Sequence, residues 1–156
     1  MKRDPLVQLP DVLTQAQANS GARFVMGVDG GATKTLAAVL DLQSMTLHLG
    51  HGGPSNQDAV GADAAVGALL KAADEALEQA SIKAADLGAA VLAIAGTDPA
   101  DVARNVRAAR PETWILVNDV VGAWATATGG GPGVAAIAGT GSNVFGVGLE
   151  LSLIHI

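Results

Sequence analysis

Two short turns rich in glycine and threonine carry the chemistry that this sequence offers to a phosphate group. The first is Asp29-Gly30-Gly31-Ala32-Thr33-Lys34 and the second is Gly139-Thr140-Gly141-Ser142, and each lies between two apolar runs. Glycine at such turns lets backbone N–H groups approach an anion, because any Cβ would block the approach. Either turn alone also fits an ordinary hairpin, since Asp-Gly is a hairpin signal. Both together, with Thr33 and Thr140 in matching places, favour phosphate binding.

Other phosphate-binding motifs do not fit. Residues 30–35 lack the Gly-Lys-Thr ending of a P-loop, because Thr33 precedes Lys34. Residues 131–136 match G-x-G-x-x-A in letters. They follow an expected helix and enter an expected strand, however, which is the wrong order for a dinucleotide site.

Two aspartates fall where an expected strand ends. Asp119 separates an apolar strand from a helix, and a carboxylate at that edge of an α/β sheet could accept the proton of an attacking hydroxyl. Asp119 would also serve as a helix N-cap, and the two roles are compatible. Asp29 could hold a Mg²⁺ ion through water, or simply form its turn. Asp98 is interpreted as a cap alone.

One polar loop follows the first group of strands. Asn56, in Pro54-Ser55-Asn56, could hydrogen-bond a sugar hydroxyl. The residues themselves favour a turn or a helix cap at this position.

The expected elements place these residues on an α/β layered domain. Residues 23–29, 35–41 and 46–51 predict three strands, the first two forming a hairpin. Helical spacing covers 59–80, and a buried parallel strand is expected at 87–95. A helix opened by the cap at 97–99 and running to 109, a strand at 114–118 and a helix at 119–128 follow. After the glycines at 129–131, strands at 134–138 and 144–149 repeat the opening hairpin, which indicates two related domains.

Composition limits the classes of function. The chain has 156 residues and is 49% hydrophobic, which is enough for a packed core. A formal net charge of −6 argues against a nucleic-acid partner or an anionic membrane surface. The absence of cysteine removes disulfides and thiolate chemistry. Residues 1–21 hold no apolar run long enough for a signal peptide or a membrane helix, so we expect a cytoplasmic protein without membrane partners.

The ordered motifs resemble a known family. Residues 27–35 are similar to the first phosphate motif of the BadF/BadG/BcrA/BcrD ATPase family, residues 117–123 to its connecting motif with a catalytic aspartate, and residues 138–143 to its second phosphate motif. This family includes N-acetylglucosamine kinase and bacterial glucosamine kinases, within the actin/Hsp70/hexokinase superfamily. The resemblance spans residues 24–148 with the motif order kept. It implies a ribonuclease H-like actin/hexokinase ATPase fold and the use of ATP with Mg²⁺.

Position by position, the resemblance assigns roles to the candidate residues. It implies Asp119 as the base, and Thr33 and Thr140 near the ATP phosphates. The remaining candidates for the nucleotide are Asp29, Gly30, Gly31, Lys34, Gly139 and Gly141. It implies Asn56, Ser142 and Asn143 near an amino sugar, which is the expected small-molecule partner. A homodimer is compatible with these features.

The expected domains follow from the motifs. Residues 1–22 are expected to form an extension, 23–131 the first ATPase-fold domain, and 132–150 the start of a second domain. Residues 151–156 are an in-frame translation of CTG TCT CTT ATA CAC ATC, the adapter end of transposase-made sequencing libraries, so we expect them to be non-biological. The family's Gly/Trp-rich sugar loop is absent, and we expect this chain alone not to turn over.

Two other functions stay open at this point. An ATPase activator of a 2-hydroxyacyl-CoA dehydratase belongs to the same family, but such activators hold an iron–sulfur cluster through cysteines. A non-catalytic sugar-sensing protein of the same fold is the other alternative. Asp119 and the two phosphate turns argue against the latter.

Overall fold

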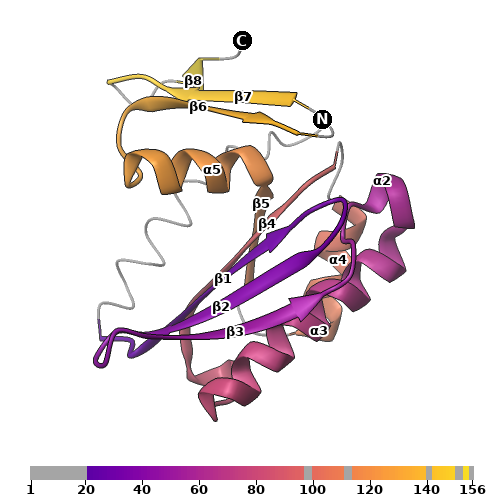
Figure 1. Ribbon diagram of the computed structural model, residues 1–156, viewed down its shortest axis with the longest axis vertical. Coiled ribbons are helices and arrows are strands. Elements are labelled where there is room, and N and C mark those ends of the chain that lie inside the picture. The colour runs from indigo at the N-terminus through magenta and orange to yellow at the C-terminus, as the bar shows by residue number, and fades with distance from the viewer. Residues whose placement is uncertain (1–20, 97–99, 111–113, 140–141, 150–152, 155–156) are drawn as a thin grey trace.

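The described part of the chain is built on two β-sheets that lie on either side of one helix. The structure is a computed structural model, and it describes residues 21–96, 100–110, 114–139, 142–149 and 153–154. The first sheet has five strands in the order β3-β2-β1-β4-β5, and the second has three in the order β6-β7-β8. Figure 1 shows α5 between the two sheets and α3 and α4 on the far side of the first sheet.

The strands of the first sheet follow the predicted order. They are β1 (Phe24–Gly30), β2 (Thr35–Asp41), β3 (Thr46–Gly52), β4 (Leu87–Ile94) and β5 (Trp114–Asn118). The first three form an antiparallel meander, whereas β4 and β5 pair in parallel with β1 and β4. The second sheet contains β6 (Gly133–Ala138), β7 (Ser142–Val147) and β8 (Leu153–Ile154), all antiparallel. The predicted α/β class is confirmed.

The helices differ from the prediction in one place. They are α2 (Gln57–Val60), α3 (Ala62–Ala80), α4 (Ala100–Ala109) and α5 (Asp119–Thr128), with a 3₁₀ turn η2 (Ala84–Asp86) before β4. The single helix expected over 59–80 is interrupted at Gly61, whose φ of 82° is not helical. The cap expected at 97–99 lies outside the described residues.

Two hydrophobic cores cover the two faces of the first sheet. The first core packs α3 and α4 against β1, β2, β4 and β5, and it includes Leu69, Leu92, Val102 and Trp114. Close approach of α3 to β3 requires glycine, because a Cβ at Gly50 would overlap the carbonyl oxygen of Ala72. The second core packs α5 and the second sheet against β5, and it includes Val117, Trp124 and Phe145. Trp114 and Trp124 are both buried.

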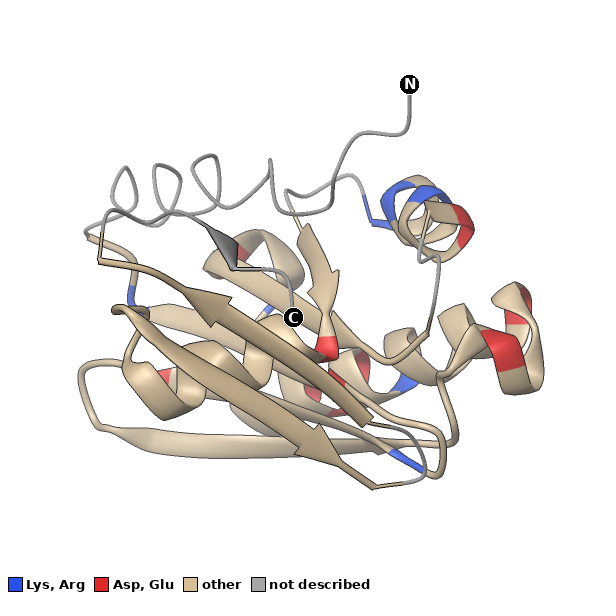
Figure 2. Cartoon of the chain, turned by 90° about the horizontal axis from the view of Figure 1, so that it is seen from above, with Lys and Arg blue, Asp and Glu red and all other residues tan. Residues whose placement is uncertain are grey.

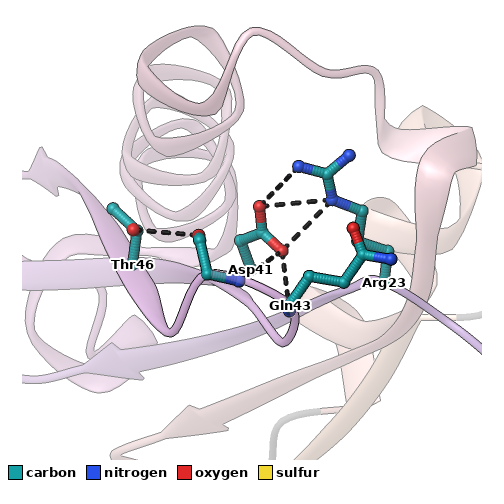
Figure 3. A network of polar contacts seen from close by, with 5 residues as sticks. Arg23, Asp41, Gln43 and Thr46 are labelled. Carbon is teal, nitrogen blue, oxygen red and sulfur yellow. Dashed lines mark hydrogen bonds and ion pairs between the residues drawn. The ribbon is translucent and has the colours of Figure 1, made fainter.

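A salt bridge closes the end of the β1–β2 hairpin that is remote from the glycine turn. Arg23 Nη2 lies 2.7 Å from Asp41 Oδ2, and the Gln43 backbone N–H donates to Asp41 Oδ1 at 2.9 Å (Figure 3). The Arg23 guanidinium lowers the pKa of the Asp41 carboxyl well below its usual range, chiefly by hydrogen bonding. This pair fixes the register of the two strands that lead into the turn.

Charged residues are distributed over the helices. Figure 2 shows acidic and basic segments interspersed along them, while most of the strand surface carries neither charge. Within the described ranges, no helix combines the length and the apolar content needed to cross a membrane. The predicted absence of nucleic-acid and membrane partners, the cytoplasmic location, the domain boundaries and the adapter origin of 151–156 stay predictions.

Candidate functional site

The carboxyl ends of three parallel strands meet at one edge of the first sheet. Asp29 of β1 pairs with Ala93 of β4, which in turn pairs with Val117 of β5. One residue further, Gly30, Ile94 and Asn118 form the next row. Because this register is continuous, the turn after β1, the loop after β4 and the start of α5 all leave the sheet at the same edge, where α/β sheets bind ligands.

The first glycine turn is a tight connection at this edge. The Gly31 N–H donates to the Lys34 carbonyl at 3.0 Å, which closes the turn between β1 and β2. Thr33 and Lys34 at its tip are exposed, as is the Asp29 side chain, whereas Gly30 is buried. The predicted cofactor residues of this turn therefore lie together, with exposed side chains where a phosphate could approach.

Asp119 is the first residue of α5 and is not the helix cap. The cap is Asn118, whose Oδ1 accepts a hydrogen bond from the Val120 N–H at 3.1 Å. The N-cap interpretation of Asp119 is thus wrong, because the strand extends through Asn118 and the helix starts one residue later. The Asp119 carboxylate therefore does not cap the helix.

The pKa of Asp119 is raised above its ordinary value. Burial of the carboxyl is the largest cause, and the negative charge of Asp29 adds to it. Hydrogen bonds from the backbone N–H groups of Val120 and Asp119 act in the opposite direction. The two carboxylates are therefore electrically coupled across the sheet edge, and a general base needs such an elevated pKa to hold a proton.

The second glycine turn connects β6 and β7. Gly139 is exposed, and Ser142 begins β7 opposite Ala138, whereas Thr140 and Gly141 lie outside the described residues. Asn143 Nδ2 donates to Asn118 Oδ1 at 3.2 Å, so the second hairpin contacts the first sheet beside Asp119. Of the predicted residues in this turn, Ser142 and Asn143 are thereby placed at the same edge as Asp29.

Asn56 also reaches this edge. Its Oδ1 accepts from the Asp58 N–H at 2.9 Å and caps the short helix α2, as the residues themselves predicted. An ideal Cβ built on Gly96, just after β4, would lie 3.7 Å from Asn56 Oδ1. The loop before α2 and the loop after β4 are thus neighbours at this edge.

Comparisons with known proteins agree with this arrangement. The model of the BadF/BadG/BcrA/BcrD ATPase family matches residues 26–149. The chain belongs to this ATPase family. No curated protein sequence matches the chain.

Among solved structures, the chain is similar to a candidate N-acetylglucosamine kinase from Chromobacterium violaceum. The identity is 26% and the TM-score is 0.72, over 85% of this chain and 48% of that one. YeaZ from Pseudomonas aeruginosa is 14% identical, with a TM-score of 0.46 over 79% of this chain and 58% of that one. The chain spans about half the length of the first of these structures. The predicted actin/hexokinase-type ATPase fold is confirmed.

Sequence reasoning missed one residue of the site. Asn118 accepts from Val120 and Asn143 through Oδ1, and its Nδ2 donates to the Gly96 carbonyl at 3.3 Å. The orientation of the amide follows from the Val120 N–H, which requires an oxygen opposite it. The Asn118-Asp119 pair at the boundary between strand and helix was the available signal. The capping role was assigned to Asp119, whereas Asn118 is the cap.

The arrangement also fits a magnesium ion. Mg²⁺ is usually bound by one or two carboxylates together with waters and substrate phosphates, and not by a cage of protein ligands. The described residues contain no cluster of three or more potential metal ligands, and the negative charge of Asp29 repels an ionised Asp119 at the edge. A divalent cation beside Asp29 would neutralise this repulsion. The family's use of ATP is consistent with such a cation.

Proposed function

We propose that this chain supplies the ATP site and the catalytic base of a kinase that phosphorylates an amino sugar of the N-acetylglucosamine or glucosamine class. The observation that carries the proposal is the place of Asp119, which begins α5 at the sheet edge where Asn143 of the second hairpin contacts Asn118, and the raised pKa of Asp119 supports it. The similarity to a candidate N-acetylglucosamine kinase supports the substrate class. The proposed activity is that of a protein of the length of that structure, of which this chain covers 48%.

Each candidate residue has a role in this proposal. The turns at 30–34 and 139–141 bind the ATP phosphates through backbone N–H groups, hydroxyls and the Lys34 ammonium. Asn56, Ser142 and Asn143 hydrogen-bond the sugar. Asp119 accepts the proton of the attacking sugar hydroxyl, and Asp29 holds Mg²⁺ through water. The magnesium ion, when bound, neutralises charge on the transferred phosphoryl group.

The test uses the full-length gene product and measures ADP release with a panel of amino sugars. We expect sugar-dependent release that falls by about 10²- to 10⁴-fold in Asp119→Asn, the range typical of a lost general base. ATP binding, measured by calorimetry, should be kept in that variant. Asp101→Asn, at the exposed start of α4, is the matched control and should be as active as the wild type.

Two outcomes would contradict the proposal. ADP release that ignores every sugar would favour an activating ATPase of the dehydratase type, although this chain contains no cysteine for a shared cluster. ATP or sugar binding without any ADP release would favour a non-catalytic sensor. A homodimer stays a prediction, and sedimentation of the same sample would decide it.

A further inference from the structure

Two hydroxyl side chains are completely buried beside the first phosphate turn and have no role in the proposed chemistry. Thr35 opens β2 and is 1% exposed, while Ser55 lies in the loop before α2 and is 0% exposed. A buried hydroxyl costs free energy unless it is hydrogen-bonded. The hydrogen-bond partners of the two hydroxyls therefore indicate the structural role of Thr35 and Ser55.

The hydroxyls form an ordered chain of hydrogen bonds. Thr35 Oγ1 lies 2.8 Å from the Gly53 carbonyl oxygen and 2.9 Å from Ser55 Oγ. A threonine hydroxyl has a single hydrogen and the carbonyl can only accept, so Thr35 donates to Gly53 and Ser55 donates to Thr35. The side chain of Thr35 thus binds the loop at two points.

Backbone contacts complete the connection. The Ser55 N–H donates to the Gly31 carbonyl at 2.9 Å, in the middle of the phosphate turn. A Cβ at Gly30 would lie 2.5 Å from Ser55 Oγ, so glycine at this position makes room for the hydroxyl. The loop that carries Asn56 is therefore attached directly to the turn that carries Thr33 and Lys34.

The two sides of this connection are not equally well held. The turn is also fixed by the β1–β2 ladder, by its own Gly31–Lys34 bond and by the Ala95 N–H, which donates to the Gly30 carbonyl at 2.8 Å. The loop at 53–56 is joined to the turn and to β2 by Thr35 and by the Gly31 carbonyl. Loss of the hydroxyl pair would consequently release the loop and leave the turn in place.

We propose that Thr35 and Ser55 are positioning residues that clamp the Asn56 loop to the phosphate turn and so fix the acceptor subsite relative to the phosphate subsite. The inference rests on the proposed function for the identity of the acceptor. The clamp itself depends only on contacts within the chain. Neither side chain touches a substrate, because both are buried.

The first experiment measures the clamp in this chain without any ligand. Amide hydrogen exchange is followed by NMR at Ser55, whose N–H donates to Gly31, in Thr35→Val, Thr35→Ser and the matched control Thr46→Val. Thr46 accepts a hydrogen bond from Ser44 at an exposed position. We expect exchange at Ser55 to accelerate about tenfold or more in Thr35→Val. Thr35→Ser and Thr46→Val should behave as the wild type.

The second experiment measures positioning in the full-length protein. Thr35→Val should raise the KM for the sugar about tenfold while changing the KM for ATP much less, and Thr35→Ser should restore the sugar KM. Gly30→Ala is a second perturbation, since its methyl group displaces Ser55 without removing a donor. It should accelerate exchange at Ser55 even if Thr35→Val fails to fold.

The outcomes are distinguishable. Unchanged protection of Ser55 in both Thr35→Val and Gly30→Ala would overturn the clamp. Lost protection with an unchanged sugar KM would overturn the positioning role. If the wild type phosphorylates no sugar, the proposed function fails, and the exchange experiment still decides whether the hydroxyl pair holds the loop.

Discussion

The negative charge of Asp29 contributes to the raised pKa of Asp119 across the edge of the first sheet. The two residues come from β1 and from the first turn of α5, and β4 lies between their strands. Burial makes the ionised form of Asp119 costly, and the charge of Asp29 makes it more so. The neighbouring negative charges that favour proton acceptance by Asp119 would also attract a cation. A substitution at Asp29 should therefore be detected in the titration of Asp119.

Replacing Asp29 by Asn should lower the pKa of Asp119, because it removes a neighbouring negative charge. The measurement is a ¹³C NMR titration of the Asp119 carboxyl in this chain. Burial persists in the variant, so the pKa should stay above the ordinary value. Asp101→Asn, with its exposed Arg104 partner, should leave the Asp119 titration unmoved. An unchanged Asp119 pKa in Asp29→Asn would show that the two carboxylates do not share a site.

Asp119→Asn should stabilise the fold at neutral pH. A carboxyl whose pKa is raised on folding binds its proton more tightly in the folded state, so its ionised form lowers the free energy of unfolding at high pH. This penalty should fade as the pH drops through the folded pKa and vanish below the unfolded value of about 3.9. Urea unfolding at several pH values measures it. A variant less stable than the wild type at neutral pH would contradict the assigned cause.

Arg23→Ala should have the opposite pH dependence. Asp41 has a pKa lowered by Arg23, so the pair stabilises the fold above the unfolded pKa of about 3.9 and loses this effect as the pH falls further. The variant should unfold at lower urea concentration than the wild type at neutral pH, with a difference that shrinks in acid. Arg104→Ala is the control, and its exposed pair with Asp101 should contribute at most about 1 kcal/mol. A pH-independent difference for Arg23→Ala would point to lost packing on Phe24.

At the scale of elements, α5 positions the site because it packs directly on the first sheet. Gly122 makes this packing possible, since a Cβ at this position would lie 2.7 Å from the Ala93 Cβ. Asp119 lies one turn earlier on the same helix. A displacement of α5 from β4 would therefore move the carboxylate away from Asp29.

Gly122→Ala should destabilise the fold by about 1–3 kcal/mol through overpacking, reduced by the better helix propensity of alanine. Gly67→Ala in α3 is the matched control, because a Cβ there has nothing within 4 Å. That control should stabilise the fold by about 0.5–1 kcal/mol. Urea unfolding compares the two. Stabilisation in both variants would mean that α5 does not sit tightly on β4.

The sequence predicted most elements because their signals are local. Continuous apolar runs specify β2 and β5, the turn glycines mark the end of β1, and the αL conformation of Gly129 ends α5 where the glycine run predicted it. Two local features were mistaken. The helix expected over 59–80 breaks at Gly61, and the cap of α5 is Asn118 in place of Asp119. The positive φ of Gly61 decides the first case, and the choice between two adjacent polar residues for the cap decides the second.

The site was predicted less completely because it depends on contacts between distant segments. Asp29 and Asp119 were each predicted where a strand ends, and the strand order of the sheet brings them to one edge. The contact of Asn143 with Asn118, the approach of Asn56 to Gly96 and the burial of Ser55 under Gly30 have no local signal. The sequence showed that these loops contain polar residues, but it did not show which residues they contact.

At the scale of the whole molecule, the two cores share the first sheet. Leu116 of β5 belongs to the core with α3 and α4, whereas Ile115 and Val117 of the same strand belong to the core with α5 and the second sheet. Each core also contains one tryptophan, Trp114 in the first and Trp124 in the second. Because β5 contributes to both, we expect the two cores to unfold together.

Phe145→Ala tests this coupling, since Phe145 of β7 packs edge-to-face on Trp124 with ring centroids 5.7 Å apart. The substitution should cost about 3 kcal/mol by leaving a cavity. Fluorescence in Trp114→Phe and Trp124→Phe backgrounds reports each core separately, and the urea midpoints of both reporters should shift equally. Val134→Ala, on the exposed face of the same sheet, should shift neither appreciably. A shift confined to Trp124 would mean that the second sheet and α5 open independently, in which case Asp119 would lose its fixed place beside Asp29.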